Sequence, residues 1–231
     1  MDGSAGHNLD PLHHDWAARS PGSARGQMCN RGQFANGVSA TIVTEDILRA
    51  TWSPEYQAIR THYADRVAKG SGLALLQRIA EGLIILSELD ASEAAMRAFC
   101  LHPLFQADED PIHHGQDFMN SVDADPFVIL LVMEFRSRAN AWSTDKVQRS
   151  HDGSRMAADG NPYAGPIEAV KHMLIADKVQ QRKDFIRHHR GKHPCSDALD
   201  LFFDRWLEAL NVGRTEYEEL CAAIDIARIR R

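Results

Sequence analysis

Two polar side chains, far apart in the sequence, fall on helical faces that are otherwise apolar. His102 shares its face with Ala98 and Phe99, and Asp177 lies within the apolar arc of the helix expected over 166–190. A buried carboxylate is costly unless it is paired or bound to a metal ion, and imidazole and carboxylate groups are common metal ligands. Either side chain could therefore be a metal ligand. Without a metal, His102 would be a core histidine, and Asp177 would be satisfied by an arginine, a backbone cap or water.

A run of acidic residues follows His102. Pro103 should end or bend the helix that carries His102, and the chain then reads Asp108-Glu109-Asp110. Beside a metal ion, Glu109 or Asp108 could transfer protons as a general acid or base; otherwise the run is a solvated loop. The side chains that could complete a metal shell are those of Asp108, Asp110, His113, His114, His151 and Asp152.

A basic cluster closes the helix that carries Asp177. The sequence RHHRGKHP over 187–194 contains His188, which shares the face of Asp177 at 100° per residue. The charges of this cluster could hold a phosphate group. The alternative is a solvated helix end, where cations offset the helix dipole and Gly191 stops the helix.

Helices must position these groups, because helix start signals recur from residue 44 almost to the end of the chain. Ser53 before a proline is an N-cap, Asp90 begins a capping box, and Asp125 before a proline opens a further helix. No segment shows the alternating pattern of a strand. We predict an all-α fold, with one helical domain over 42–231 and a flexible tail over 1–41, which is rich in small and polar residues.

The helix expected from residue 126 is apolar on all sides in its first half, PFVILLVMEF. Such a helix is typical of the middle of a bundle, so we expect the other helices to pack around it. Its apolar run, Phe127 to Met133, is far shorter than the roughly 20 residues of a membrane span. An amphipathic helix over 216–229 could mediate a homodimer.

The composition excludes some classes of protein. The 231 residues include 26 Lys and Arg and 32 Asp and Glu, for a net charge of −6, so we expect no DNA binding, which usually requires a net basic face. The four cysteines form no CxxC pair, and the N-terminus lacks the pattern of a secretory signal. We expect reduced thiols and a cytoplasmic protein without membrane contact.

The order of the segments carries a family resemblance. An apolar helix, LALLQRIAEGLIILSEL, is followed by DASEAAMRAFCLHPLFQADED, then by a further apolar helix and by MLIADKVQQRKDF. This order, over residues 70–190, resembles the HD-domain phosphohydrolase superfamily, including its (p)ppGpp hydrolase branch. Its members are all-α and bind a divalent metal through a leading His, a His-Asp doublet and a distant Asp. His102 matches the doublet His and Asp177 the distant Asp, whereas Pro103 stands in place of the doublet Asp and Gln77 at about the place of the leading His.

The resemblance implies a divergent HD-type metal-dependent phosphohydrolase that acts on a nucleotide or another phosphorylated small molecule. His102 and Asp177 would bind Mn, Fe, Mg or Zn, and Glu109 and Asp108 would be the catalytic acids. The residues expected to contact the substrate are Gln77, Arg78, Lys178 and His188.

Two other functions are consistent with the same segments. Because Pro103 and Gln77 stand at expected ligand positions, the chain could be a non-catalytic HD-like helical binding or regulatory module that has lost the metal site. His102 and Asp177 would then pair with each other or with Arg78. An HD-like oxygenase that uses iron is the third reading, since related folds host redox chemistry.

Overall fold

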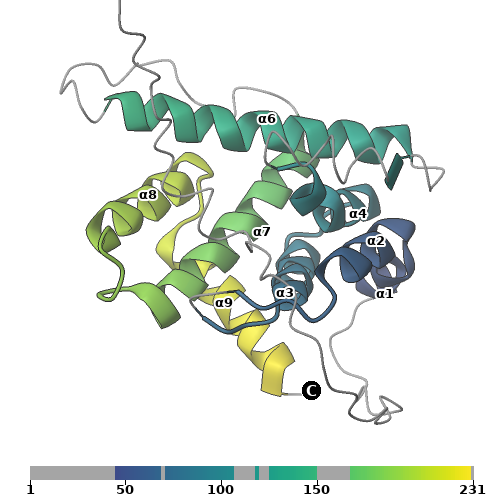
Figure 1. Ribbon diagram of the computed structural model, residues 1–231, viewed down its shortest axis with the longest axis horizontal. Coiled ribbons are helices and arrows are strands. Elements are labelled where there is room, and N and C mark those ends of the chain that lie inside the picture. Colours follow the sequence, from purple (N-terminus) through teal and green to yellow (C-terminus); the bar gives the residue numbers. More distant parts are fainter. Residues whose placement is uncertain (1–44, 69–70, 107–117, 120–124, 150–166, 230–231) are drawn as a thin grey trace, which may run out of the picture.

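The computed structural model describes residues 45–68, 71–106, 118–119, 125–149 and 167–229, with the backbone alone for 141–149 and 228–229 (Figure 1). The all-α prediction is confirmed, since these residues form helices and no strand. The predicted tail over 1–41 lies outside the described residues. The elements are α1 (Glu45–Trp52), α2 (Pro54–Tyr63), α3 (Leu75–Glu88), α4 (Glu93–Leu101), the 3-10 turn η1 (His102–Leu104), α6 (Pro126–Arg149), α7 (Glu168–Asp184), the π-helical turn η3 (Phe185–His189), α8 (Ser196–Ala209) and α9 (Arg214–Ile229).

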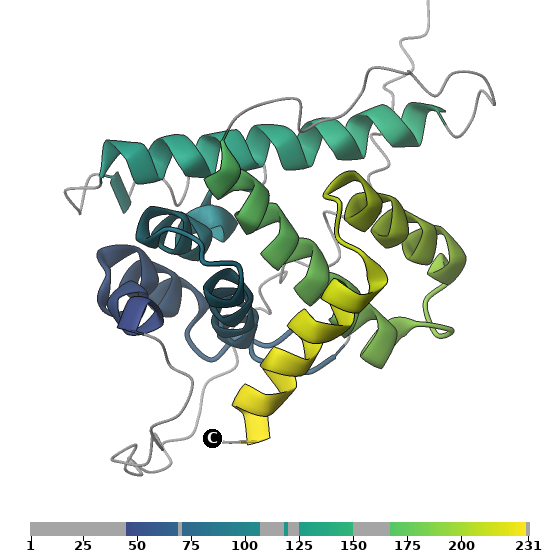
Figure 2. The same cartoon turned by 180° about the vertical axis from the view of Figure 1, so that it is seen from behind.

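Helix α7 occupies the middle of the fold. It packs against α3, α4, α6, α8 and α9 (Figures 1 and 2). Its side chains Met173, Leu174 and Val179 are completely buried. They belong to one hydrophobic core that extends from Ile47 in α1 to Ile224 in α9. The central position of α7 matters for function, because α7 also carries Asp177.

The predicted position of the apolar helix that begins at residue 126 is wrong. This helix, α6, forms an outer layer along one side of the molecule (Figures 1 and 2). Its inner face is fully buried, but Phe127, Leu130 and Met133 on its outer face are 53%, 52% and 42% exposed. Hydropathy predicted the wrong central helix, because the polar groups of α7 pair with one another when buried and so allow a partly polar helix to occupy the middle of the fold. Despite its apolar half, neither α6 nor any other helix within the described ranges has the length and hydropathy of a membrane span.

Side-chain caps explain where several helices begin. Ser53 caps α2 and Asp125 caps α6, and each accepts a backbone N–H of the first turn, at 3.2 and 2.9 Å. The predicted capping box at Asp90 is wrong, because Ser92 caps α4 instead. Ser92 has the extended backbone of an N-cap, whereas Asp90 adopts a φ of 50° in the turn before it. At the other end of the chain, Gly191 has a φ of 74° and follows η3, as expected of a helix stop.

An ion-pair cluster ties α2, α4 and the start of α6 together. Glu55 of α2 is 0% exposed, and its two oxygens accept hydrogen bonds of 3.1 and 2.9 Å from Arg97 of α4. Arg97 also lies 3.6 Å from Asp125, which precedes α6. A bidentate arginine–carboxylate pair is among the stronger hydrogen-bonded contacts in proteins. This cluster fixes α4, and with it the helix end that carries His102.

Candidate functional site

His102 follows the last residue of α4 and is the first residue of the 3-10 turn η1, in which Pro103 is the second. Its ring is 7% exposed and packs between Phe99 and Phe135, with ring centroids 4.7 and 4.9 Å away. The Nδ1 atom lies 2.6 Å from the carbonyl oxygen of Phe99. A carbonyl only accepts, so Nδ1 carries the proton and donates it. The other ring nitrogen, Nε2, therefore presents a lone pair toward α7.

Asp177 of α7 faces this lone pair. Its Oδ1 lies 3.9 Å from His102 Nε2, too far for a hydrogen bond. The carboxylate has two closer partners, since Oδ2 forms an ion pair with Lys178 Nζ at 2.7 Å and Oδ1 accepts a hydrogen bond of 2.6 Å from Gln181. Asp177 and Lys178 are 4% and 5% exposed. The structure thus brings His102 and Asp177 together and adds Lys178 to the pair.

Burial and neighbouring charges set the protonation of this pair. Burial lowers the pKa of His102 below its ordinary value, and the nearby Asp177 carboxylate offsets only part of that effect. Burial acts to raise the pKa of Asp177, but the charges of Lys178 and His102 outweigh it, so the pKa is lowered. At neutral pH the imidazole of His102 is therefore neutral and the carboxylate of Asp177 is ionised.

A second group of buried charges lies between α3 and α7, about one to two turns further along α7. Glu81 is 3% exposed, and its carboxylate pairs with the ammonium of Lys183, which is 2% exposed. Lys183 Nζ also lies 3.3 Å from Asp184. Gln180 donates a hydrogen bond of 2.7 Å to Asp184. The Glu81–Lys183 pair thus joins α3 to α7, and the contacts of Asp184 with Gln180 and Lys183 lie within α7.

Gln77 and Arg78, which were predicted to contact a substrate, belong to this second group. Gln77 donates a hydrogen bond of 3.0 Å to Glu81, and Arg78 Nε lies 3.5 Å from Asp184. Both side chains are therefore engaged by carboxylates of this group. We call the whole set the α3–α7 network; it comprises Gln77, Arg78, Glu81, Gln180, Lys183 and Asp184.

The described residues of this region carry three carboxylates and three cations, all but Arg78 buried. The carboxylates are those of Glu81, Asp177 and Asp184, and the cations are those of Arg78, Lys178 and Lys183. A site that awaits a divalent cation carries excess negative charge, whereas the described side chains of this region supply as many cations as carboxylates.

The described residues do not fit a catalytic metal. Open catalytic sites usually have three protein ligands, and in the described part of the chain no three His, Cys, Asp or Glu side chains gather around one point. His102 and Asp177 supply two donors, and Lys178 neutralises one of them. The other predicted participants, Asp108, Glu109, Asp110, His113, His114, His151 and Asp152, lie outside the described residues.

His188 lies in η3, about three helical turns beyond Asp177. Its ring is 6.3 Å from that of His189. Two arginines of the predicted phosphate-binding cluster are already paired, Arg187 with Asp225 of α9 and Arg190 with Asp200 of α8. These ion pairs fasten η3 to its neighbours and leave less free charge for a phosphate group.

Sequence reasoning missed Glu81 and Lys183. Glu81 was indicated by its position, since it is one of only three charged residues in the mostly apolar helix LLQRIAEGLIILSE. Lys183 gave no comparable signal, because long basic side chains are common near helix ends.

The chain matches no known family model, no curated protein and no solved structure.

Proposed function

We propose that this protein is a non-catalytic HD-like helical module, with a binding or regulatory role, in which an ion pair replaces the metal site. The observation that carries the proposal is the Lys178 ammonium, 2.7 Å from the Asp177 carboxylate in the protein interior. His102, Asp177 and the order of the helices support descent from an HD-type ancestor. Pro103 and Gln77, at the positions of two family ligands, support the loss of the metal.

Electrostatics explains why Lys178 opposes metal binding. A divalent ion on Oδ1 of Asp177 would lie roughly 5 Å from the ammonium, and at an effective dielectric constant of about 20 the two would repel by about 7 kcal/mol. The carboxylate, meanwhile, already has Gln181 as a donor on Oδ1. In this setting, His102 and Asp177 stabilise the packing of α4 against α7.

Metal analysis and unfolding together test this proposal. Protein purified without chelators is expected to contain far less than one metal equivalent per chain, and to release no phosphate from a panel of nucleotides with Mn²⁺. His102→Ala should lower the free energy of unfolding, because it removes a buried ring that packs on Phe99 and Phe135. His62→Ala, a partly buried histidine of α2, is the matched control. One bound metal per chain, lost on chelation, would overturn the proposal.

A metal-dependent phosphohydrolase is the second candidate, and the orientation of His102 favours it. Metal-binding histidines usually donate their other N–H to a carbonyl or carboxylate, as Nδ1 does here to Phe99. His102 and Asp177 would then be ligands to Mn, Fe, Mg or Zn, and a bound metal would polarise a phosphate and lower the pKa of water. Lys178 and Arg78 would face the negative charge of a nucleotide or another phosphorylated small molecule.

The two candidates differ in one measurement. The phosphohydrolase predicts Mn²⁺-dependent phosphate release that Asp177→Asn abolishes and Asp204→Asn, an exposed carboxylate on α8, leaves unchanged. The non-catalytic module predicts no release from any of the three proteins. Release of phosphate by the wild-type protein would therefore be enough to decide in favour of the phosphohydrolase.

A further inference from the structure

A small hydrophobic cluster lies apart from the main core, at the point where η3 meets the first half of α8. Phe185 of η3 packs with Leu199 and Phe203 of α8, and the three side chains are 0%, 3% and 6% exposed. This part of the molecule lies on the side opposite α1 and α2 (Figures 1 and 2). We call residues 185–203 the η3–α8 corner. Because so few side chains are buried in the corner, its packing contributes limited stability, and such regions open before the core does.

Two arginine–aspartate pairs supplement this packing. Arg190 pairs with Asp200 of α8 at 2.8 Å, and Arg187 pairs with Asp225 of α9. The side chain of Arg190 is 56% exposed and that of Asp225 is 43% exposed. Ion pairs this exposed to water contribute little to stability. A modest change in charge can therefore shift the corner between a closed and an open form.

Three histidines lie within the corner. His188 and His189 belong to η3, with ring centroids 6.3 Å apart. His193 lies in the turn before α8, where its Nδ1 accepts a hydrogen bond of 3.1 Å from the backbone N–H of Cys195. An N–H group only donates, so Nδ1 of His193 accepts through a lone pair and carries no proton. Protonation of this nitrogen would set two N–H groups against each other and break the bond just before α8 begins at Ser196.

Protonation of His189 is also unfavourable in the closed corner. Burial lowers its pKa below 6.5, and three basic neighbours, His188, Arg78 and His193, lower the pKa further. Asp184 acts in the opposite direction but does not outweigh them. The open form therefore binds a proton more readily than the closed form does. The closed form is fully favoured above pH 6.5 and loses stability as the pH falls toward the lower pKa of the folded state.

We propose that the η3–α8 corner is a pH-sensitive switch, which opens in mild acid while the main core stays folded. Protonation of its histidines would add positive charge to a segment that already carries Arg187, Arg190 and Lys192. The described charged groups around the corner include Arg78 and Glu81 of α3, Lys183 and Asp184 of α7, Asp197 and Asp200 of α8, and Asp225 of α9. Asp184, Asp200 and Asp225 already pair with basic residues, so the added charge meets repulsion rather than a new partner.

Opening would bring Phe185, Leu199 and Phe203 into contact with water, because their cluster is separate from the main core. The second half of α8 belongs to the main core and stays packed. The proposal does not depend on the function of the His102–Asp177 pair, since neither residue belongs to the corner.

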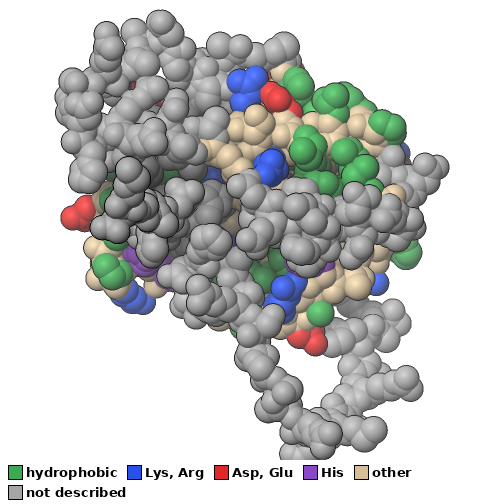
Figure 3. Space-filling view, turned by 45° about the horizontal axis from the view of Figure 1, so that its top comes forward, with side chains coloured by type: hydrophobic (Ala, Val, Ile, Leu, Met, Phe, Trp, Pro, Cys, Tyr) green, Lys and Arg blue, Asp and Glu red, His purple; other side chains and the backbone are tan. Residues whose placement is uncertain are grey.

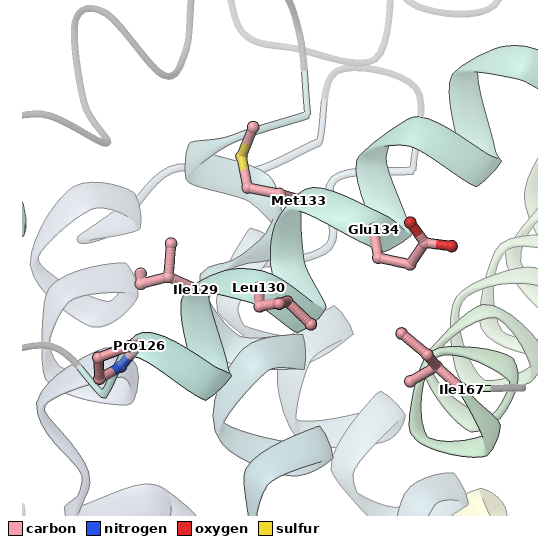
Figure 4. Close-up of a pocket in the computed structure, with 6 residues that line it drawn as sticks. All are labelled: Pro126, Ile129, Leu130, Met133, Glu134 and Ile167. Atoms are coloured by element: carbon pink, nitrogen blue, oxygen red, sulfur yellow. The ribbon is translucent and has the colours of Figure 1, made fainter.

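A second apolar surface decides how the opening can be measured. On the outer face of α6, Phe127, Leu130 and Met133 are each more than two-fifths exposed, and hydrophobic side chains gather over this part of the surface in Figure 3. A shallow groove beside them is lined by Ile129 and by Ile167, which precedes α7 (Figure 4). An apolar dye could bind here at any pH, because none of these side chains titrates. Amide hydrogen exchange is therefore the suitable measurement, since it locates an opening along the chain.

The test compares amide hydrogen exchange of the full-length chain at about pH 7.5 and about pH 5.5, on either side of the ordinary pKa of histidine. The rates are corrected for the pH dependence of intrinsic exchange. Protection of residues 185–203 should then fall several-fold more than protection of α3, which lies in the main core. Equal changes in the two regions, or no change in either, would overturn the proposal.

Two substitutions show whether the histidines cause the opening. His189→Gln removes one titrating ring, and His193→Asn keeps an acceptor for the N–H of Cys195 without titrating near neutral pH. The double variant should therefore lose most of the extra exchange at the lower pH. His172→Gln is the matched control, because His172 is a partly buried histidine of α7 whose pKa is also lowered by burial; it should leave the effect unchanged. Circular dichroism checks that the variants fold. A folded double variant that still opens in acid would assign the opening to other groups and contradict the proposal.

Discussion

Replacing Asp177 with asparagine removes the negative charge that faces Lys178 and so measures its contribution to stability. The ammonium lies 2.7 Å from Oδ2 of Asp177, and both residues are almost fully buried. Asparagine has nearly the same shape and can still accept the hydrogen bond from Gln181. Removing one partner of a buried ion pair costs about 3–5 kcal/mol. The ring of Trp206, 5.0 Å from the ammonium, remains to stabilise the cation, so we expect a loss near the lower end, about 3 kcal/mol.

Urea unfolding followed by circular dichroism measures this loss, with a chelator present so that bound metal does not contribute. The matched control is Asp204→Asn, which breaks a more exposed ion pair with Arg182 and should cost less than about 1 kcal/mol. Adding Lys178→Met to Asp177→Asn should recover much of the loss, because no buried charge then lacks a partner. If Asp177→Asn is as stable as wild type, or more stable, Lys178 is not held by the carboxylate and the proposed ion pair is refuted.

Three further changes test other contacts, each by urea unfolding. Gly82→Ala should lower the free energy of unfolding by about 1–3 kcal/mol, because the new Cβ would overlap the ring of Phe99 even though alanine favours a helix. Adding Phe99→Leu should restore part of this loss. Unchanged stability of Gly82→Ala would show that the ring moves aside. Arg97→Ala should cost about 3–5 kcal/mol because it leaves the carboxylate of Glu55 buried without its partner, and adding Glu55→Gln should recover part of it. His102→Gln should flatten the pH dependence of stability below pH 6.5. Burial lowers the pKa of His102 from 6.5, so as the pH falls the unfolded wild type binds a proton that the folded state resists, and wild type loses stability. Parallel pH profiles for wild type and variant would contradict this reasoning.

The helices were predictable from the sequence, but their layers were not. Ser53 and Asp125 cap helices as the sequence indicates, because capping depends on a few neighbouring residues. The position of α6 depends on what covers Leu130 and Met133, and hydropathy records only that these side chains are apolar. A helix that is apolar all round was therefore placed in the middle, whereas the structure places it outside.

The candidate site was predictable only in part, for a related reason. His102 and Asp177 stand out as polar residues on apolar faces, and the structure brings them to 3.9 Å. The roles of Lys178 and Lys183 depend on which helix each side chain meets, which requires the packing of α7 against its neighbours. From the sequence, the buried carboxylate of Asp177 is expected to bind a metal ion, but in the structure its partner is the ammonium of Lys178.

The π-helical turn η3 makes the segment that follows α7 sensitive to the deletion of a single residue. A π-helical turn takes up more residues than an α-helical one, so residues after Phe185 are rotated relative to the regular period that relates Asp177 to His188. Loss of one residue here would restore that period and swing the histidines around the axis by about 100°. Arg187 and Arg190 would then leave Asp225 and Asp200. A single deletion would therefore break two ion pairs and reposition His188 and His189.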